Sequence, residues 1–151
     1  MSTIHKQPSA PLLVEITSFS FKEPLPDHLF SQETPRHGGG FVFDCRSLPN
    51  PGREAQFKDQ TGLDASVREY LEKSTEVSQF KLSVFSLIEP AVRNFLERQF
   101  TFMNVSFGCT GGQHRSVFLA EELSSHLKSI LPGLVTPTVH HHTLKRKGFL
   151  R

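Results

Sequence analysis

The chain reads Thr101-Phe102-Met103-Asn104-Val105-Ser106-Phe107 and continues directly into Gly108-Cys109-Thr110-Gly111-Gly112-Gln113-His114-Arg115-Ser116. The first seven residues predict a strand, and the closely spaced glycines after them predict a tight turn. A helix is predicted from about His114 to Ile130, and Pro132-Gly133 ends it. A strand, a turn and a helix in this order are typical of an α/β fold.

The rest of the chain continues this alternation. Further strands are predicted at Leu12–Phe21, Phe41–Asp44 and Leu134–His140. A helix starts near Thr61–Asp64, and a longer one follows from Val77 to Phe95, where Pro90 predicts a kink or a split. The long connections imply a mainly parallel sheet covered by helices, with ligands bound beyond the carboxyl ends of the strands.

The composition limits the classes of protein to which the chain can belong. A chain of 151 residues with a net charge of +2 fits one domain and does not by itself indicate nucleic-acid binding. Two cysteines fit a reducing cytosol, and we find no signal peptide and no membrane-length apolar run. We therefore expect a cytoplasmic protein without a membrane partner, comprising a disordered N-terminus (1–11), a ligand-binding domain (12–143) and a basic C-terminal tail (144–151).

The glycine-rich turn has the features of an anion site. Glycines let the backbone approach a ligand, and the N–H groups at the start of a helix favour negative charge. Arg115 can make a bidentate contact to phosphate, Thr110 and Ser116 offer hydroxyls, and His114 can exchange a proton near neutral pH. The alternative is a tight turn without a ligand. The turn lacks the Walker A pattern, so ATP hydrolysis by that route is not expected.

The same residues also match Cys-x5-Arg-Ser, the signature of cysteine-dependent phosphatases. In this interpretation Cys109 is the nucleophile, Arg115 holds the phosphate and Asp44 serves as general acid. The pattern is short, however, and a cysteine at the end of a buried strand is often a small packing residue. Both interpretations of Cys109 remain open at this point.

Three further groups of polar residues are candidates for binding a ligand. Asp44, Arg46 and Asn50 follow the second strand and either bind a ligand or organise their own loop. In His140-His141-His142, neighbouring strand residues point to opposite faces, so we expect no metal site and place one histidine, His141, at the ligand site. The basic residues Lys145, Arg146 and Lys147 either attract phosphates, including those of RNA, or form a solvated end.

Several of these motifs occur together in order. They are Phe41-Val42-Phe43-Asp44-Cys45-Arg46-Ser47-Leu48-Pro49-Asn50-Pro51, Thr61-Gly62-Leu63-Asp64 and the turn from Gly108 to Val117. Ile16-Thr17-Ser18-Phe19-Ser20-Phe21-Lys22 and His141-His142-Thr143-Leu144 match at the two ends. Over roughly residues 12 to 147 the chain resembles the C-terminal domain of the RapZ/YvcJ family, a bacterial family of regulators.

The resemblance implies a three-layer α/β domain related in fold to a phosphofructokinase subdomain. It also implies a ligand from amino-sugar metabolism, glucosamine-6-phosphate or UDP-N-acetylglucosamine, and regulation of an RNA or protein partner. We expect no cofactor and favour self-association. The expected ligand-binding residues are Asp44, Arg46, Asn50, Cys109, Thr110, Gly111, Gly112, His114, Arg115 and His141; the expected RNA-binding residues are Lys145, Arg146 and Lys147.

Three departures from the family pattern affect these expectations. The family's P-loop domain is not in this sequence, His140-His141-His142 stands where the family has Arg-His-Arg, and Gln113 replaces a frequent lysine. The main hypothesis is a non-catalytic sensor of a phosphorylated sugar or nucleotide sugar. The alternatives are a phosphatase using Cys109 and Arg115, and an RNA-binding module acting through the basic tail.

Overall fold

The structure is a computed structural model that describes residues 10–26 and 39–150. Most of the N-terminal segment expected to be disordered lies outside the described residues. No helix in the described part of the chain is both long and apolar enough to cross a membrane.

Four parallel strands form one sheet in the order β2-β3-β1-β4. They are β1 (Leu12–Ser20), β2 (Gly40–Asp44), β3 (Phe102–Cys109) and β4 (Val135–His141). The register aligns the carboxyl ends of the strands, since Ser20 pairs with Cys109 and Asp44 pairs with Gly108. The α/β class and the parallel sheet predicted from the sequence are confirmed.

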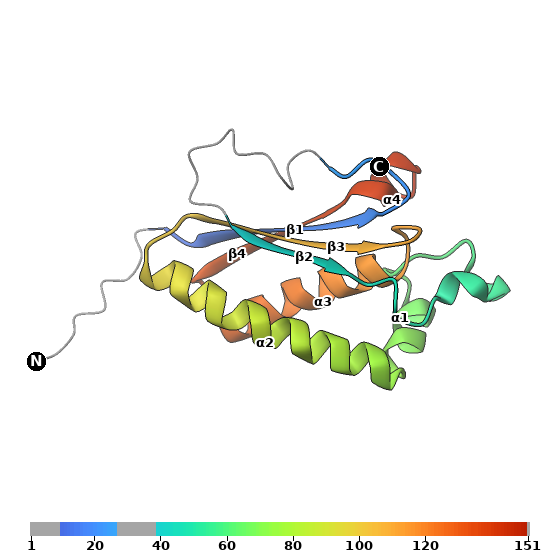
Figure 1. The fold of residues 1–151 in the computed structure, drawn as a ribbon, viewed down its shortest axis with the longest axis horizontal. Helices are drawn as coiled ribbons and strands as arrows, with labels where there is room; N and C mark the ends of the chain where they lie inside the picture. Colours follow the sequence, from blue (N-terminus) through green and yellow to red (C-terminus); the bar gives the residue numbers. More distant parts are fainter. Residues whose placement is uncertain (1–9, 27–38, 151) are drawn as a thin grey trace, which may run out of the picture.

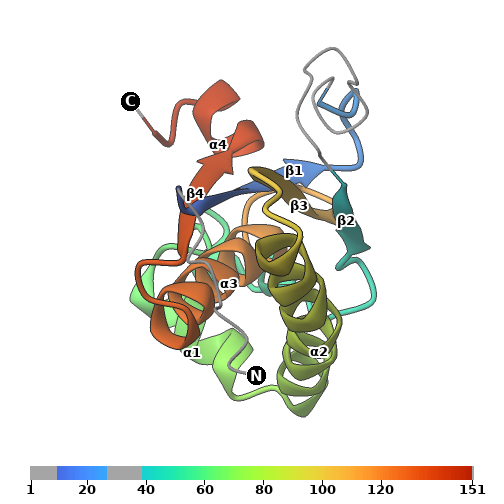
Figure 2. The ribbon, with the colours of Figure 1, turned by 90° about the vertical axis from the view of Figure 1, so that its left-hand side faces the viewer.

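The three longer helices lie on one face of this sheet (Figures 1 and 2). They are α1 (Ala65–Glu72), α2 (Thr75–Glu97) and α3 (Arg115–Ile130). Two short 3-10 turns, η2 (Pro51–Arg53) and η3 (Ala55–Phe57), connect β2 to α1. The short α4 (His142–Arg146) lies on the other side of the sheet, at the end of β4 (Figure 2). The sequence did not predict this last helix.

Pro90 does not split α2, which is one helix from Thr75 to Glu97. A proline removes the hydrogen bond to the carbonyl four residues earlier, here that of Ser86. Both residues are exposed, so water can reach the carbonyl that loses its partner. Ser74 begins the helix by accepting a hydrogen bond from the N–H of Val77.

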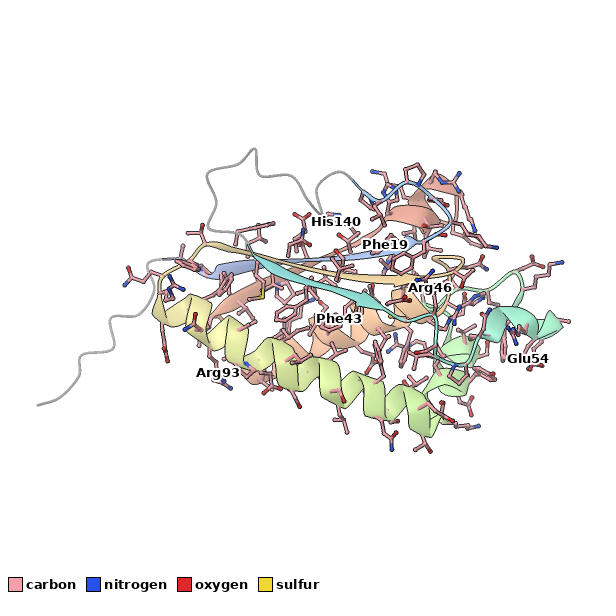
Figure 3. The ribbon with its side chains drawn as sticks, in the orientation of Figure 1. Phe19, Phe43, Arg46, Glu54, Arg93 and His140 are labelled. Atoms are coloured by element: carbon pink, nitrogen blue, oxygen red, sulfur yellow. The ribbon has the colours of Figure 1, made fainter. Side chains whose placement is uncertain are left out.

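The core lies between the sheet and these helices. Val14 and Ile16 of β1 and Met103 and Val105 of β3 are fully buried, as is Ile88 of α2. Aromatic rings contribute to this core at β2. The ring centre of Phe43, which Figure 3 labels, is 5.5 Å from that of Phe107 and 6.5 Å from that of Phe80. Because this packing fixes α3 against β1 and β3, it also fixes the turn that joins β3 to α3.

Candidate functional site

Contacts with Ser20 of β1 and Thr143 of α4 hold the glycine-rich turn in place. The Ser20 hydroxyl donates a hydrogen bond of 2.6 Å to the carbonyl of Thr110. Gly112 has a φ of 63°, and a Cβ there would lie 2.5 Å from Oγ1 of Thr143 and 2.8 Å from the nitrogen of Ser20. A Cβ on Gly111 would meet no atom within 4 Å. Gly112 is therefore required for the turn to form, whereas the outer side of Gly111 is open.

The backbone of this turn presents free donors. Within the described residues, the N–H groups of residues 110–114 make no hydrogen bond to another protein group. They precede the first turn of α3, whose dipole adds partial positive charge at the same place. This arrangement suits an anion.

Arg115 is the buried cation of the site, with 3% of its surface exposed. Its Nη1 donates to the carbonyls of Arg46 and Leu48, at 2.8 and 2.9 Å. Its Nη2 makes only a long contact of 3.5 Å to the Thr110 hydroxyl. Nε is buried without a partner in the described part of the protein. An unpaired buried donor on a charged group is costly, and an anion that reached this edge would satisfy it.

Two neighbouring cavities open at this arginine. The first, of about 230 Å³, includes Lys22 and Lys58 in its lining together with Gly111 and His114. The second, of about 390 Å³, includes Arg46 and Arg53. Residues common to both linings are Asn50, Thr110 and Arg115. Both cavities are therefore rich in positive charge.

Asp44 and Arg46 form a pair at the edge of the site. The guanidinium of Arg46 contacts both carboxylate oxygens of Asp44, at 2.6 to 3.0 Å, and lies 4.2 Å from the ring centre of Phe21. The hydrogen bond from Arg46 lowers the pKa of the Asp44 carboxyl below its usual value. Asp44 is thus held ionised, which disfavours its expected role as general acid in the phosphatase alternative. Figure 3 shows Arg46 at the carboxyl end of the sheet.

Asn50 and His114 are fixed by local contacts. Oδ1 of Asn50 accepts a hydrogen bond from the N–H of Gly52 and so begins η2. Nε2 of His114 lies 2.9 Å from the carbonyl of Phe57, which assigns the proton to Nε2. Burial lowers the pKa of His114, so the neutral ring is favoured. Its expected proton exchange near neutral pH is correspondingly disfavoured.

The sequence did not predict three residues of the candidate site, Gln113, Lys22 and Lys58. The side-chain amide of Gln113 donates to the carbonyls of Lys58 and Gln60, at 2.9 and 2.7 Å. It thereby fixes the segment after η3 against the turn. Lys58 belongs to no motif, and Lys22 ends a stretch that matches the family without indicating a role in the site. Only the fold brings the two lysines to the first cavity.

Cys109 is also in the lining of the first cavity, although only 2% of its surface is exposed. Its sulfur lies 3.1 Å from the hydroxyl of Ser116. Cys45, the other cysteine, is buried and free as well, and burial raises the pKa of its thiol. The placement of Cys109 fits a small wall residue.

His141 is outside both cavities. Its Nδ1 lies 2.7 Å from the Ser18 hydroxyl and its Nε2 lies 2.7 Å from the Glu121 carboxylate, so it connects β1, β4 and α3. His140 is exposed on the opposite face of the sheet (Figure 3). The alternation of these two rings agrees with the strand geometry expected from the sequence, but the structure does not bring His141 to the anion site.

The basic residues near the C-terminus have different surroundings. Arg146 forms an ion pair of 2.5 Å with Glu23, and Nζ of Lys147 donates to the carbonyl of Gly111 at 3.3 Å. Lys145 is exposed. Two of the three expected RNA-binding residues therefore contact the protein itself.

Comparison with known proteins identifies the family. The family model of the RapZ C-terminal domain matches residues 12–145. A relative from Acidithiobacillus ferrooxidans named nucleotide-binding protein is 39% identical over 113 residues, covering 75% of this chain and 34% of that protein. Relatives of the same name from Shewanella halifaxensis and Thermotoga neapolitana are 34% and 35% identical over 134 and 120 residues, covering 89% and 80% of this chain. The chain spans 34% to 43% of the length of these relatives. It belongs to the RapZ C-terminal domain family.

Proposed function

We propose that this domain is a non-catalytic sensor that binds a phosphorylated sugar or nucleotide sugar, of the glucosamine-6-phosphate or UDP-N-acetylglucosamine class. The phosphate occupies the first cavity, against the turn from Thr110 to His114. The observation that carries this proposal is Arg115, whose buried Nε has no partner in the described residues at the point where the two cavities meet.

The donors around this arginine match an anion with several oxygens. Free backbone N–H groups lie on one side, and Lys22 and Lys58 supply flexible ammonium groups in the same lining. Charge-assisted hydrogen bonds of this kind are the strongest that a protein can offer to a phosphate. The names of the relatives, nucleotide-binding protein, are consistent with a ligand of this class.

Binding without catalysis is favoured over the phosphatase alternative. Asp44, the expected general acid, is held ionised by Arg46, and Cys109 is buried against Ser116. Release of a sugar hydroxyl from its phosphate is assisted by a proton donor, and a carboxylate with a lowered pKa is a poor donor near neutral pH. A sensor instead needs a ligand whose binding changes the exposed surface that a regulatory partner, RNA or protein, contacts.

Isothermal titration calorimetry with glucosamine-6-phosphate and UDP-N-acetylglucosamine tests the proposal. Lys22→Gln and Lys58→Gln remove a cation from the first cavity and should weaken binding about tenfold or more each, since hydrogen bonds to charged groups contribute about 1.5–3 kcal/mol. Lys128→Gln is the matched control, because Lys128 is exposed in the last turn of α3. Unphosphorylated glucosamine should not bind.

A folded protein that binds neither phosphorylated compound would contradict the proposal. Equal weakening by the Lys128 variant would also contradict it, because the effect would then come from the net charge of the domain rather than from the cavity.

A further inference from the structure

A third cavity continues from the two at Arg115. It has a volume of about 790 Å³ and lies between the segment that contains η3 and the neighbouring ends of α1 and α2. Its lining and that of the 390 Å³ cavity share Pro49 and Glu76. Three cavities thus follow one another, from the glycine-rich turn, past the loop after β2, to the surface of α1.

The third cavity, at the far end of this series, has aromatic side chains in its lining. Tyr70 of α1 and Phe57 of η3 both line the third cavity, and their ring centres are 5.3 Å apart. Phe57 is buried and Tyr70 is only partly buried, so Tyr70 presents the accessible ring. A flat, partly exposed aromatic side chain is a stacking surface for a planar heterocycle.

The junction between the second and third cavities carries a carboxylate. The Glu76 side chain accepts a hydrogen bond of 2.9 Å from the hydroxyl of Ser74. Hydrogen bonds from its own backbone N–H and from Ser74 lower the pKa of Glu76 below its usual value, so the group is ionised at neutral pH. A carboxylate would repel a phosphate here, whereas it can accept hydrogen bonds from the hydroxyls of a sugar.

The chemistry therefore changes in order along the three cavities. Basic groups surround Arg115, a carboxylate stands at the junction, and an aromatic surface lies beyond it. We propose that the third cavity binds the nucleoside of a nucleoside diphosphate ligand, with the base on Tyr70, the ribose hydroxyls at Glu76 and the diphosphate at Arg115. This inference rests on the proposed function and narrows it, because a simple sugar phosphate has no group to fill the third cavity.

The test measures two probes by isothermal titration calorimetry, uridine diphosphate and inorganic pyrophosphate. Tyr70→Leu should weaken the binding of uridine diphosphate about tenfold, from the loss of a stacking contact, and leave pyrophosphate binding unchanged. Tyr70→Phe keeps the ring and should bind both probes as the unaltered protein does. Lys58→Gln, at the phosphate end, should weaken both probes.

Glu76→Ala gives a second readout that does not depend on the packing of α1, because Glu76 is an exposed residue at the start of α2. The unaltered protein should bind uridine diphosphate more tightly than its 2′,3′-dideoxy analogue, and the variant should lose this preference.

The outcomes separate the two proposals. If neither Tyr70→Leu nor Glu76→Ala changes the binding of uridine diphosphate while Lys58→Gln weakens both probes, the nucleoside site is wrong and the phosphate site stands. If the folded protein binds neither probe nor the two sugar compounds, the proposed function is wrong and the nucleoside site fails with it.

Discussion

Nη1 of Arg115 donates a hydrogen bond of 2.9 Å to the backbone carbonyl of Leu48. The first residue of α3 is thereby joined to the loop that follows β2, which is nearly 70 residues earlier in the chain. The same guanidinium group therefore both joins these two segments and lies at the centre of the proposed anion site. A ligand that binds its free edge also stabilises the loop.

Arg115→Lys should destabilise the protein. A lysine keeps the charge but cannot reach two carbonyls while it presents a planar edge to a ligand. Loss of these bonds leaves the carbonyls of Arg46 and Leu48 without their donor, so the free energy of unfolding should fall by about 1–3 kcal/mol. Urea denaturation measures this, and Arg93→Lys, at an exposed position of α2, is the control that should change nothing. Equal stabilities for the two variants would contradict the structural role.

Gly112→Ala and Gly111→Ala should differ although the residues are neighbours. The φ of 63° at Gly112 costs about 1–2 kcal/mol for an alanine, and the contacts with Thr143 and Ser20 add to this. Gly111 has open space around it, so its variant should unfold at nearly the normal temperature. Differential scanning calorimetry of the two proteins compares them directly. Similar unfolding temperatures would show that the turn adapts to a side chain.

His114 should make the protein less stable in mild acid. Burial lowers the pKa of its ring in the folded state below the value of 6.5 expected when the chain is unfolded. As the pH falls below about 6.5, the unfolded chain takes up the proton first, so the free energy of unfolding decreases until the folded pKa is reached. His114→Gln should remove this part of the pH dependence, whereas His140→Gln, at an exposed site, should keep it. Denaturation curves between pH 7.5 and 5 test the difference.

Cys109→Ser should leave ligand binding within about twofold of normal, because a wall residue of similar size replaces the thiol. Neither protein should release phosphate from an aryl phosphate such as p-nitrophenyl phosphate. Phosphate release that the substitution abolishes would overturn the sensor proposal and restore Cys109 as a nucleophile.

The site was predictable from the sequence wherever its signal is local. The strand, the turn and the start of α3 are consecutive, so Thr110 to Arg115 could be predicted as a candidate anion site before the fold was known. Lys22, Lys58 and Tyr70 come from separate segments. No short pattern indicates that the fold brings the two lysines to the first cavity and Tyr70 to the third.

His141 shows a different limit. Strand alternation correctly indicated that His141 faces away from His140. The residues that contact its ring, however, depend on the packing of α3 against the sheet. The sequence could not show that Ser18 and Glu121 occupy both ring nitrogens. The expected split at Pro90 was wrong for a similar reason, because the effect of a proline depends on whether water reaches the carbonyl four residues earlier.

Thr143 packs against Gly112 from the first turn of α4, and Lys147, just beyond that helix, contacts the carbonyl of Gly111. The end of the domain thus supports a turn more than 30 residues earlier. A shortened fragment designed to stop at the last strand would lose this support, although its sheet would be complete. Expression fragments meant to retain the anion site should therefore extend through residue 147.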